Sequence, residues 1–283
     1  MSSPPRINAP VINMNEIVST HNIFMICLDS LRLDVARHAE QQQFTPTINQ
    51  YGAWEHRHAP GNFTFPAHMA IFSGFFPSPV TRVSKEVRKK SWRASWSPFI
   101  AKHGELGLAP QSNAFAFDGD NLVKGLAKIG FRTLCVGGVT FFDKRSDLGK
   151  IMPAFFEESY WRPSFSTRIK EGVCNQVDFL IQKCEESADD AKIFAYLNIA
   201  TTHYPTHQYL ENAPEVESFE SQVAALSYVD PELARLFTYA KSKRPTCVIL
   251  FSDHGTCFGE DGFYFHGHSH AVVMNVPYKQ FIL

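Results

Sequence analysis

The sequence is organised around Thr246-Cys247-Val248-Ile249-Leu250-Phe251-Ser252-Asp253-His254-Gly255. Residues 246–251 form an apolar run with the length of a strand that is buried on both faces. The run ends abruptly in an acid and an imidazole, Asp253 and His254. Such a strand end is typical of a metal-binding turn, because open α/β folds keep their sites at the carboxyl edge of the sheet.

Two other apolar runs of strand length also end in polar residues. Residues 23–28 stop at Asp29, and residues 193–199 lead into a turn that contains His203. The carboxyl ends of parallel strands share one edge of a sheet, so these polar residues should converge on Asp253 although they are distant in sequence.

Segments with the apolar spacing of helices lie between the strand-like runs. This alternation predicts an α/β fold with a mainly parallel central sheet and helices on both faces. No linker or repeat divides the chain, so a single domain is expected at 21–283, after an irregular N-terminal arm at 1–20.

The composition argues against several classes of partner. The 283 residues carry a formal net charge of −1, which predicts no general attraction to nucleic acid or to anionic membranes. No segment has the ~20 apolar residues of a membrane span, and the N-terminus lacks a signal-peptide core. The six cysteines have no CxxC spacing and are expected to be reduced. We therefore expect a soluble, cytoplasmic protein without a nucleic-acid or membrane partner, and the oligomeric state stays open.

The predicted site has the chemistry of a metal centre. Two carboxylates and an imidazole suit Zn²⁺ or Mn²⁺. Thr64 stands two residues before Pro66, which is placed to begin a helix that Gly74 can end. A hydroxyl at a helix start, next to a metal ion, is a plausible nucleophile. Helix capping is the alternative role for Thr64.

Five of the twelve histidines cluster near the predicted strand ends: His203, His254, His266, His268 and His270. In extended chain, the alternation at 266, 268 and 270 would place those three on one face. A surface loop that scavenges metal ions is the alternative for this trio. A basic run with tryptophans at 82–96 favours a solvated helix face over a substrate-facing patch.

Several of these motifs resemble the alkaline phosphatase superfamily. Residues 253–255 and 259–267 are similar to its sulfatase-like and phosphoglycerol- or phosphoethanolamine-transferase branches. Thr64-Phe65-Pro66-Ala67-His68 is similar to the nucleophile segment of the nucleotide pyrophosphatase/phosphodiesterase branch. Residues 28–32, 45–46, 121–136 and 221–255 also match in order and spacing, so the resemblance extends from Ile23 to Pro277.

The resemblance implies a set of roles for individual residues. One divalent metal ion, Zn²⁺ or Mn²⁺, would be held by Asp29, Thr64, Asp253 and His254. Thr64 would be the nucleophile, and His203 and His266 would face the substrate phosphate or a second metal ion. His268 and His270 have weaker counterparts as ligands of a second ion. The trio at 266, 268 and 270 is thus expected to face the phosphate or an optional second ion.

Three departures from the family patterns affect these expectations. Sulfatases carry a C/S-x-P/A-x-R motif, whereas here Thr64 occupies the first position and His68 the arginine position, which disfavours a sulfatase. The two-metal phosphodiesterases have an Asp where this chain has Ile199, so a second metal site would be incomplete or rebuilt. The sequence stops at Leu283, so a C-terminal subdomain is expected to be reduced or absent.

The expected activity is hydrolysis of a phosphate mono- or diester through a phosphothreonine at Thr64. The substrate would be a small-molecule or peptide-linked phosphoester. Transfer of the phosphoryl-linked group to an acceptor other than water is one alternative, and a non-catalytic metal-binding module is another. The substrate itself is not indicated, because segments 75–118 and 141–172, where such enzymes differ, carry no readable motif.

Overall fold

A computed structural model describes residues 12–74, 96–100, 113–117, 120–188, 190–211 and 215–283. The basic run that the sequence suggests to be a helix face falls within 75–95, outside the described residues. The main elements are α1 (Met14–Thr20), β1 (Asn22–Leu28), α2 (Leu33–Gln41), β2 (Glu55–His58), α3 (Thr64–Ser73), β3 (Trp96–Ile100), β4 (Asn113–Phe117), α5 (Leu122–Lys128), β5 (Phe131–Val136), β6 (Glu158–Tyr160), α6 (Gly172–Glu185), β7 (Lys192–Ile199), α7 (Phe219–Lys243), β8 (Thr246–Phe251), β9 (Cys257–Phe258), β10 (Tyr264–Phe265), α8 (Ala271–Met274) and β11 (Asn275–Ile282).

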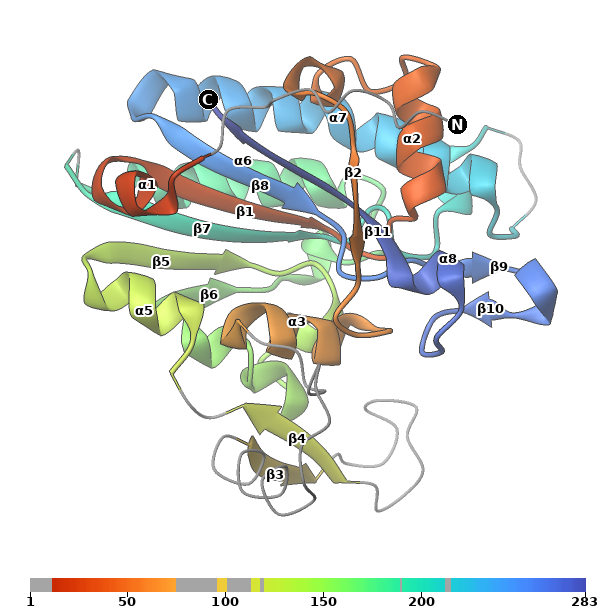
Figure 1. Cartoon of the computed structure of the whole chain (residues 1–283), viewed down its shortest axis with the longest axis horizontal. Helices are drawn as coiled ribbons and strands as arrows, with labels where there is room; N and C mark the ends of the chain where they lie inside the picture. Colours follow the sequence, from red (N-terminus) through yellow and green to blue (C-terminus); the bar gives the residue numbers. More distant parts are fainter. Residues whose placement is uncertain (1–11, 75–95, 101–112, 118–119, 189, 212–214) are drawn as a thin grey trace, which may run out of the picture.

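A seven-stranded sheet with the order β2-β11-β8-β1-β7-β5-β6 forms the centre of the molecule (Figure 1). Strands β8, β1, β7, β5 and β6 run parallel to one another, while β11 pairs antiparallel with β8 and with β2. The predicted α/β fold with a mainly parallel sheet is therefore confirmed. The three strands expected to carry site residues, β8, β1 and β7, lie side by side at its centre.

The central strands are buried on both faces, which explains their continuous apolar sequences. All seven residues of β1 are buried, and they alternate between two hydrophobic cores. Phe24, Ile26 and Leu28 pack toward the core with α2, α6 and α7, whereas Ile23 and Met25 pack toward the core with α1, α3 and α5. Helices cover both faces of the sheet, as expected for parallel strands.

The N-terminal segment differs from the sequence-based expectation. Residues 14–20, expected to belong to an irregular arm, form helix α1, whose Asn13 side chain caps the first turn and whose Ile17 is buried. Helix α7 runs without a break through Pro231, although a proline there could have restarted the helix. Among the helices that the structure describes, none has both the length and the hydrophobicity to cross a lipid bilayer. All six cysteines are unpaired thiols.

Candidate metal centre and active site

Asp29 and Asp253 come together because the strands that precede them are neighbours. Strands β1 and β8 pair in parallel, with Cys27 opposite Phe251. The chain leaves both strands at the same edge of the sheet, and the backbone N–H of Ser30 donates to Asp253 Oδ1 at 3.2 Å. The two acids, separated by 224 positions in sequence, are both fully buried at this edge.

Thr64 reaches the same point from helix α3, of which it is the first residue. Its Oγ1 lies 3.5 Å from Asp29 Oδ2 and 3.4 Å from His254 Nε2. Gly61 allows the preceding loop to pass close to the helix, since a Cβ there would lie 2.5 Å from the backbone nitrogen of Ala67. The helix begins at Thr64 and ends at Gly74 in a left-handed conformation, as the positions of Pro66 and Gly74 predict.

His254 presents Nε2 to this group of oxygen atoms. Its Nδ1 lies 2.9 Å from the carbonyl oxygen of Gly255, which can only accept, so Nδ1 carries the proton. Nε2 therefore carries no proton and has a lone pair for a ligand; it lies 3.9 Å from Asp29 Oδ1 and 3.5 Å from Asp253 Oδ2. Fixing the tautomer through the other ring nitrogen is how proteins commonly orient a metal-binding histidine. Burial lowers the pKa of His254 and keeps the imidazole neutral.

The electrostatics of the two carboxylates fit a divalent cation. Burial raises the pKa of Asp253 well above its usual value, and the negative charge of Asp29 raises it further. Burial also acts to raise the pKa of Asp29, but His203, His254 and the hydrogen bond from Asn198 lower it overall. Asp253 Oδ2 is buried and has no hydrogen-bond partner in the described part of the chain. A buried carboxylate oxygen without a partner needs a compensating charge, and a metal ion coordinated with Asp29, His254 and Thr64 would supply it.

His203 and His266 lie beside this group of residues. The ring centroids of His254 and His266 are 4.5 Å apart, and those of His266 and His203 are 5.4 Å apart. Burial, together with the neighbouring His254 and His203, lowers the pKa of His266 to about 3. The Nδ1 atom of His266 is buried without a hydrogen-bond partner among the described residues, so it is available to a ligand.

Comparison with known proteins places this arrangement in a family. A model of the sulfatase family matches residues 21–277. The chain belongs to the sulfatase family. This membership agrees with the resemblance of the sequence motifs to the alkaline phosphatase superfamily. No match was found among curated protein sequences.

Three similar structures support the fold at low sequence identity. The soluble domain of lipooligosaccharide phosphoethanolamine transferase A from Neisseria meningitidis has a TM-score of 0.61 and 13% identity, over 93% of this chain and 77% of that one. The C-terminal periplasmic domain of EcEptC from Escherichia coli in complex with Zn has a TM-score of 0.59 and 12% identity, over 93% and 72%. The lipoteichoic acid synthase LtaP from Listeria monocytogenes has a TM-score of 0.57 and 14% identity, over 94% and 70%.

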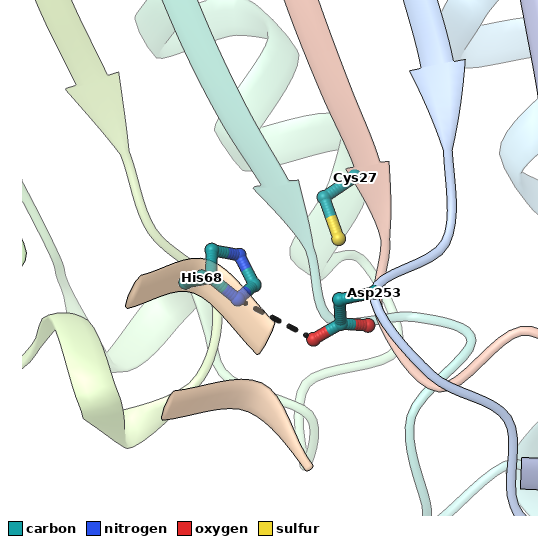
Figure 2. A group of neighbouring side chains, drawn as sticks. All are labelled: Cys27, His68 and Asp253. Atoms are coloured by element: carbon teal, nitrogen blue, oxygen red, sulfur yellow. Dashed lines mark ion pairs between the residues drawn. The ribbon is translucent and has the colours of Figure 1, made fainter. Parts of the chain in front are cut away.

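His68, which sequence reasoning did not include in the site, occupies the position of the sulfatase motif's arginine and is fully buried. Its Nδ1 lies 3.5 Å from Asp253 Oδ2 (Figure 2). The same Nδ1 lies 2.7 Å from the backbone oxygen of Thr64, and Nε2 contacts the Tyr196 hydroxyl. Burial lowers the pKa of His68 to about 4. The sequence could have indicated this contact, because residues four apart on a helix, such as Thr64 and His68, lie on the same face.

Cys27 completes a second buried group with His68 and Asp253, in which the donor atoms lie within 4.8 Å of one another (Figure 2). Both ring nitrogens of His68 already have partners, and burial together with Asp253 raises the pKa of the Cys27 thiol well above its usual value. A neutral thiol and a fully bonded imidazole are poor metal ligands. We therefore interpret Cys27 and His68 as residues that pack against Asp253 and hold its position, not as metal ligands.

Asn198 is a further residue that sequence reasoning missed. Its Nδ2 donates to Asp29 Oδ2 at 2.9 Å, and its Oδ1 accepts from the N–H groups of Gly138 and Val139 at 3.2 Å each. It lies at the end of β7 in a run otherwise taken as a buried apolar strand. A polar residue inside such a run was the signal, since a buried amide must find partners.

The structure separates the histidine trio that the sequence places on one face. Positive φ angles at Phe265 and Gly267, 62° and 94°, show that the chain is not extended there. His266 turns toward His254, whereas the ring of His268 packs against Phe263 at 4.8 Å between centroids. His270 contacts Asp261 Oδ2 at 3.1 Å and Cys257 Sγ at 3.3 Å. His266 therefore does not share a face with His268 and His270, which both pack against Phe263.

Proposed function

We propose that the protein is a metal-dependent hydrolase of phosphate mono- or diesters, with Thr64 as the nucleophile. The observation that carries this proposal is the position of Thr64 Oγ1, within 3.5 Å of both Asp29 Oδ2 and His254 Nε2 at the start of helix α3. A hydroxyl in this position has a cation site on one side and helix N–H groups on the other. Both favour an alkoxide and the negative charge of a transferring phosphoryl group.

Asp29, Asp253 and His254 would hold the metal ion together with Thr64. The ion, when bound, would lower the pKa of the threonine hydroxyl and neutralise phosphoryl oxygens. The buried and unpartnered Asp253 Oδ2 supports a cation at this point. Zn²⁺ or Mn²⁺ suits the donor set, and one ion accounts for these four residues.

The reaction would proceed in two displacements. Thr64 Oγ1 bonds to phosphorus as the bond to the leaving alcohol oxygen breaks, and Asp29 Oδ2, 3.5 Å away, is within reach of the hydroxyl proton. The alcohol leaves after taking a proton from solvent. Water then attacks the intermediate on Thr64, which releases phosphate from a monoester substrate, or the remaining monoester from a diester substrate, and restores the Thr64 hydroxyl. His203 and His266 stabilise the charge on the phosphoryl oxygens during both steps.

The two histidines are arranged for this role. His203 Nδ1 lies 2.8 Å from the carbonyl oxygen of Tyr204, so it carries a proton and leaves Nε2 for the substrate side. The Nδ1 atom of His266 has no partner among the described residues. Because the pKa of His266 is lowered to about 3, this ring is neutral near pH 7 and contributes a hydrogen bond.

Sulfatase activity is disfavoured by the chemistry of threonine, although the chain belongs to the sulfatase family. Sulfatases convert Cys or Ser to an aldehyde, whereas oxidation of a threonine hydroxyl would give a ketone. The hydrate of an aldehyde is the nucleophile in those enzymes, and Thr64 has no route to it.

The second candidate function is transfer of a phosphoryl-linked group to an acceptor other than water. It is favoured by the likeness to a phosphoethanolamine transferase and to a lipoteichoic acid synthase. An acceptor-dependent product, formed in place of free phosphate, would distinguish the transferase from the hydrolase. A non-catalytic metal-binding module would instead bind zinc tightly and turn over no phosphate or sulfate ester.

The deciding experiment compares wild type with Thr64→Ala on aryl phosphate mono- and diesters in the presence of Zn²⁺ or Mn²⁺. We expect kcat to fall by ~10⁴-fold or more, as for other covalent nucleophiles. Acid-quenched wild-type reactions should contain phosphate on Thr64 by peptide mass spectrometry. Thr64→Ser serves as the matched control because it keeps the hydroxyl. Unchanged turnover in Thr64→Ala would overturn the assignment.

A further inference from the structure

A pair of partly exposed aromatic rings stands beside the candidate active site. Tyr204 is 39% exposed and Phe265 is 49% exposed. Their ring centroids are 5.1 Å apart, with the ring planes tilted by 55°. Apolar surface that stays exposed to water forgoes the free energy of burial. Two exposed rings in contact next to an active site therefore indicate a surface that a ligand could cover.

These rings continue a row of aromatic contacts that begins at the candidate metal centre. His254 contacts His266 at 4.5 Å between centroids, and His266 contacts Tyr204 at 5.9 Å. The ring of Tyr204 also packs against His203 at 4.2 Å. A ligand whose phosphoryl group lies at His203 and His266 would therefore have its next atoms close to Tyr204 and Phe265.

The hairpin that carries Phe265 is held in place by its own contacts. Strands β9 and β10 pair antiparallel with Phe265 opposite Cys257, and Figure 1 shows this hairpin beyond the ends of β1 and β8. Phe265 has a φ of 62°, a conformation that bulky residues rarely adopt and that the surrounding structure must maintain. In the turn between β9 and β10, Glu260 Oε1 accepts from Arg32 Nη1 at 2.5 Å, and Arg32 itself is buried.

We propose that Tyr204 and Phe265 form a subsite for the apolar group of the phosphoester. This inference rests on the proposed function and adds the class of substrate: the ester of an aromatic or long-chain aliphatic alcohol. The alcohol's carbon groups cover the two rings, while the phosphoryl group lies against His203 and His266. Ring contact and burial of apolar surface together favour such a substrate over a small polar ester by about tenfold.

The test measures binding of phosphonates, which the enzyme cannot hydrolyse. Methyl-, phenyl- and hexylphosphonate are titrated calorimetrically into the zinc-loaded protein. We expect phenyl- or hexylphosphonate to bind about tenfold more tightly than methylphosphonate. The phenyl arm tests for an aromatic alcohol, and the hexyl arm tests for an aliphatic one.

Variants of Tyr204 and Phe265 then test whether these two rings cause the preference for the larger phosphonates. Tyr204→Ala and Phe265→Ala should each reduce the ratio of affinities by several fold, whereas Tyr204→Phe keeps the ring and should retain the ratio. Tyr264→Ala is the matched control, because Tyr264 is 63% exposed on the same hairpin but its side chain lies toward Gly259. The inference is overturned when wild type shows no preference, or when both alanine variants keep it.

The same data separate this inference from the proposed hydrolase. Tight binding of phenylphosphonate that depends on Tyr204, without turnover of any phosphoester, would reject the hydrolase and keep the subsite. Rapid hydrolysis of aryl and methyl phosphates at equal kcat/KM in all variants would keep the hydrolase and reject the subsite. Absence of binding by all three phosphonates rejects the subsite as well.

Discussion

The Nδ1 atom of His68 lies 2.7 Å from the backbone carbonyl oxygen of Thr64. A carbonyl oxygen only accepts, so Nδ1 carries a proton, and the same ring edge lies 3.5 Å from Asp253 Oδ2. One buried ring thus joins the proposed nucleophile to a proposed metal ligand. The hydroxyl of Tyr196 contacts the other ring nitrogen and completes the orientation of His68.

Replacing His68 with Asn should weaken zinc binding or lower kcat by about 10- to 100-fold, as is usual for groups that orient a metal ligand. The pKa of His68 is lowered to about 4, so no loss of activity from its protonation is expected above pH 5. Zinc affinity by competition with a chelator, and kcat by phosphate release, measure the two effects. His56→Asn, at an exposed position, is the control. Equal losses in both variants would contradict a special role for His68.

In metal-free protein, the Asp253 carboxyl should contribute stability at low pH that is lost as the pH rises, opposite in sign to the contributions of His68 and His266, whose pKa values are lowered. The pKa of Asp253 is raised well above its usual value by burial and by Asp29, so the folded state holds a proton that the unfolded state releases. A raised pKa gives stability that is present at low pH and lost as pH rises through the folded-state value. Zinc at 100 times its Kd should restore about 2.7 kcal/mol.

Thermal unfolding of chelator-treated protein between pH 4 and pH 8 measures this effect. In Asp253→Asn the carboxyl is gone, so the stability of the variant relative to wild type should increase as the pH rises, and zinc should stabilise the variant less. A pH profile that is identical in wild type and Asp253→Asn would rule out Asp253 as the source.

Asn198→Ala should be strongly destabilising and should also weaken metal binding. The change removes a donor from Asp29 and leaves the N–H groups of Gly138 and Val139 without their acceptor. Unsatisfied buried groups cost about 1–3 kcal/mol each, and loss of a ligand's support lowers metal affinity by about tenfold or more. Chemical denaturation and a zinc titration give the two quantities.

Asn121→Ala provides the matched control for Asn198→Ala. Asn121 caps helix α5 by accepting from the N–H of Lys124 at 2.9 Å, so its loss should cost about 1 kcal/mol. This cap bond involves none of the proposed ligands, so zinc affinity should not change. A similar loss of zinc affinity in both variants would mean that general destabilisation explains the effect.

His270→Ala should lower kcat by about tenfold while zinc affinity stays near the wild-type value, because His270 supports the segment that carries His266. Its Nδ1 accepts from the N–H of Val272 at the start of α8, and its ring contacts Cys257 and Asp261. His270→Asn can keep the cap and should recover part of the activity. Zinc binding that falls as much as kcat in His270→Ala would contradict this supporting role.

Much of the fold could be predicted from the sequence because its signals are local. Continuous apolar runs predict strands buried on both faces, and β1, β7 and β8 are such strands. Their parallel pairing follows from the helices between them. The start of α3 at Thr64 was readable from Pro66 and Gly74. Helix α1 was missed, since seven residues with one buried side chain carry little amphipathic signal.

The sequence by itself determined that Asp29 and Asp253-His254 each follow a buried, apolar strand and that Thr64 begins a helix. Parallel strands then bring these residues to one edge. Only the tertiary structure decided which other side chains join them, because that depends on the path of loops and on partners distant in sequence. The chain has positive φ angles at Phe265 and Gly267, and the ring of His266 lies beside His254, whereas those of His268 and His270 pack against Phe263. Packing across the sheet likewise brings Asn198 to Asp29, a contact that no local pattern contains.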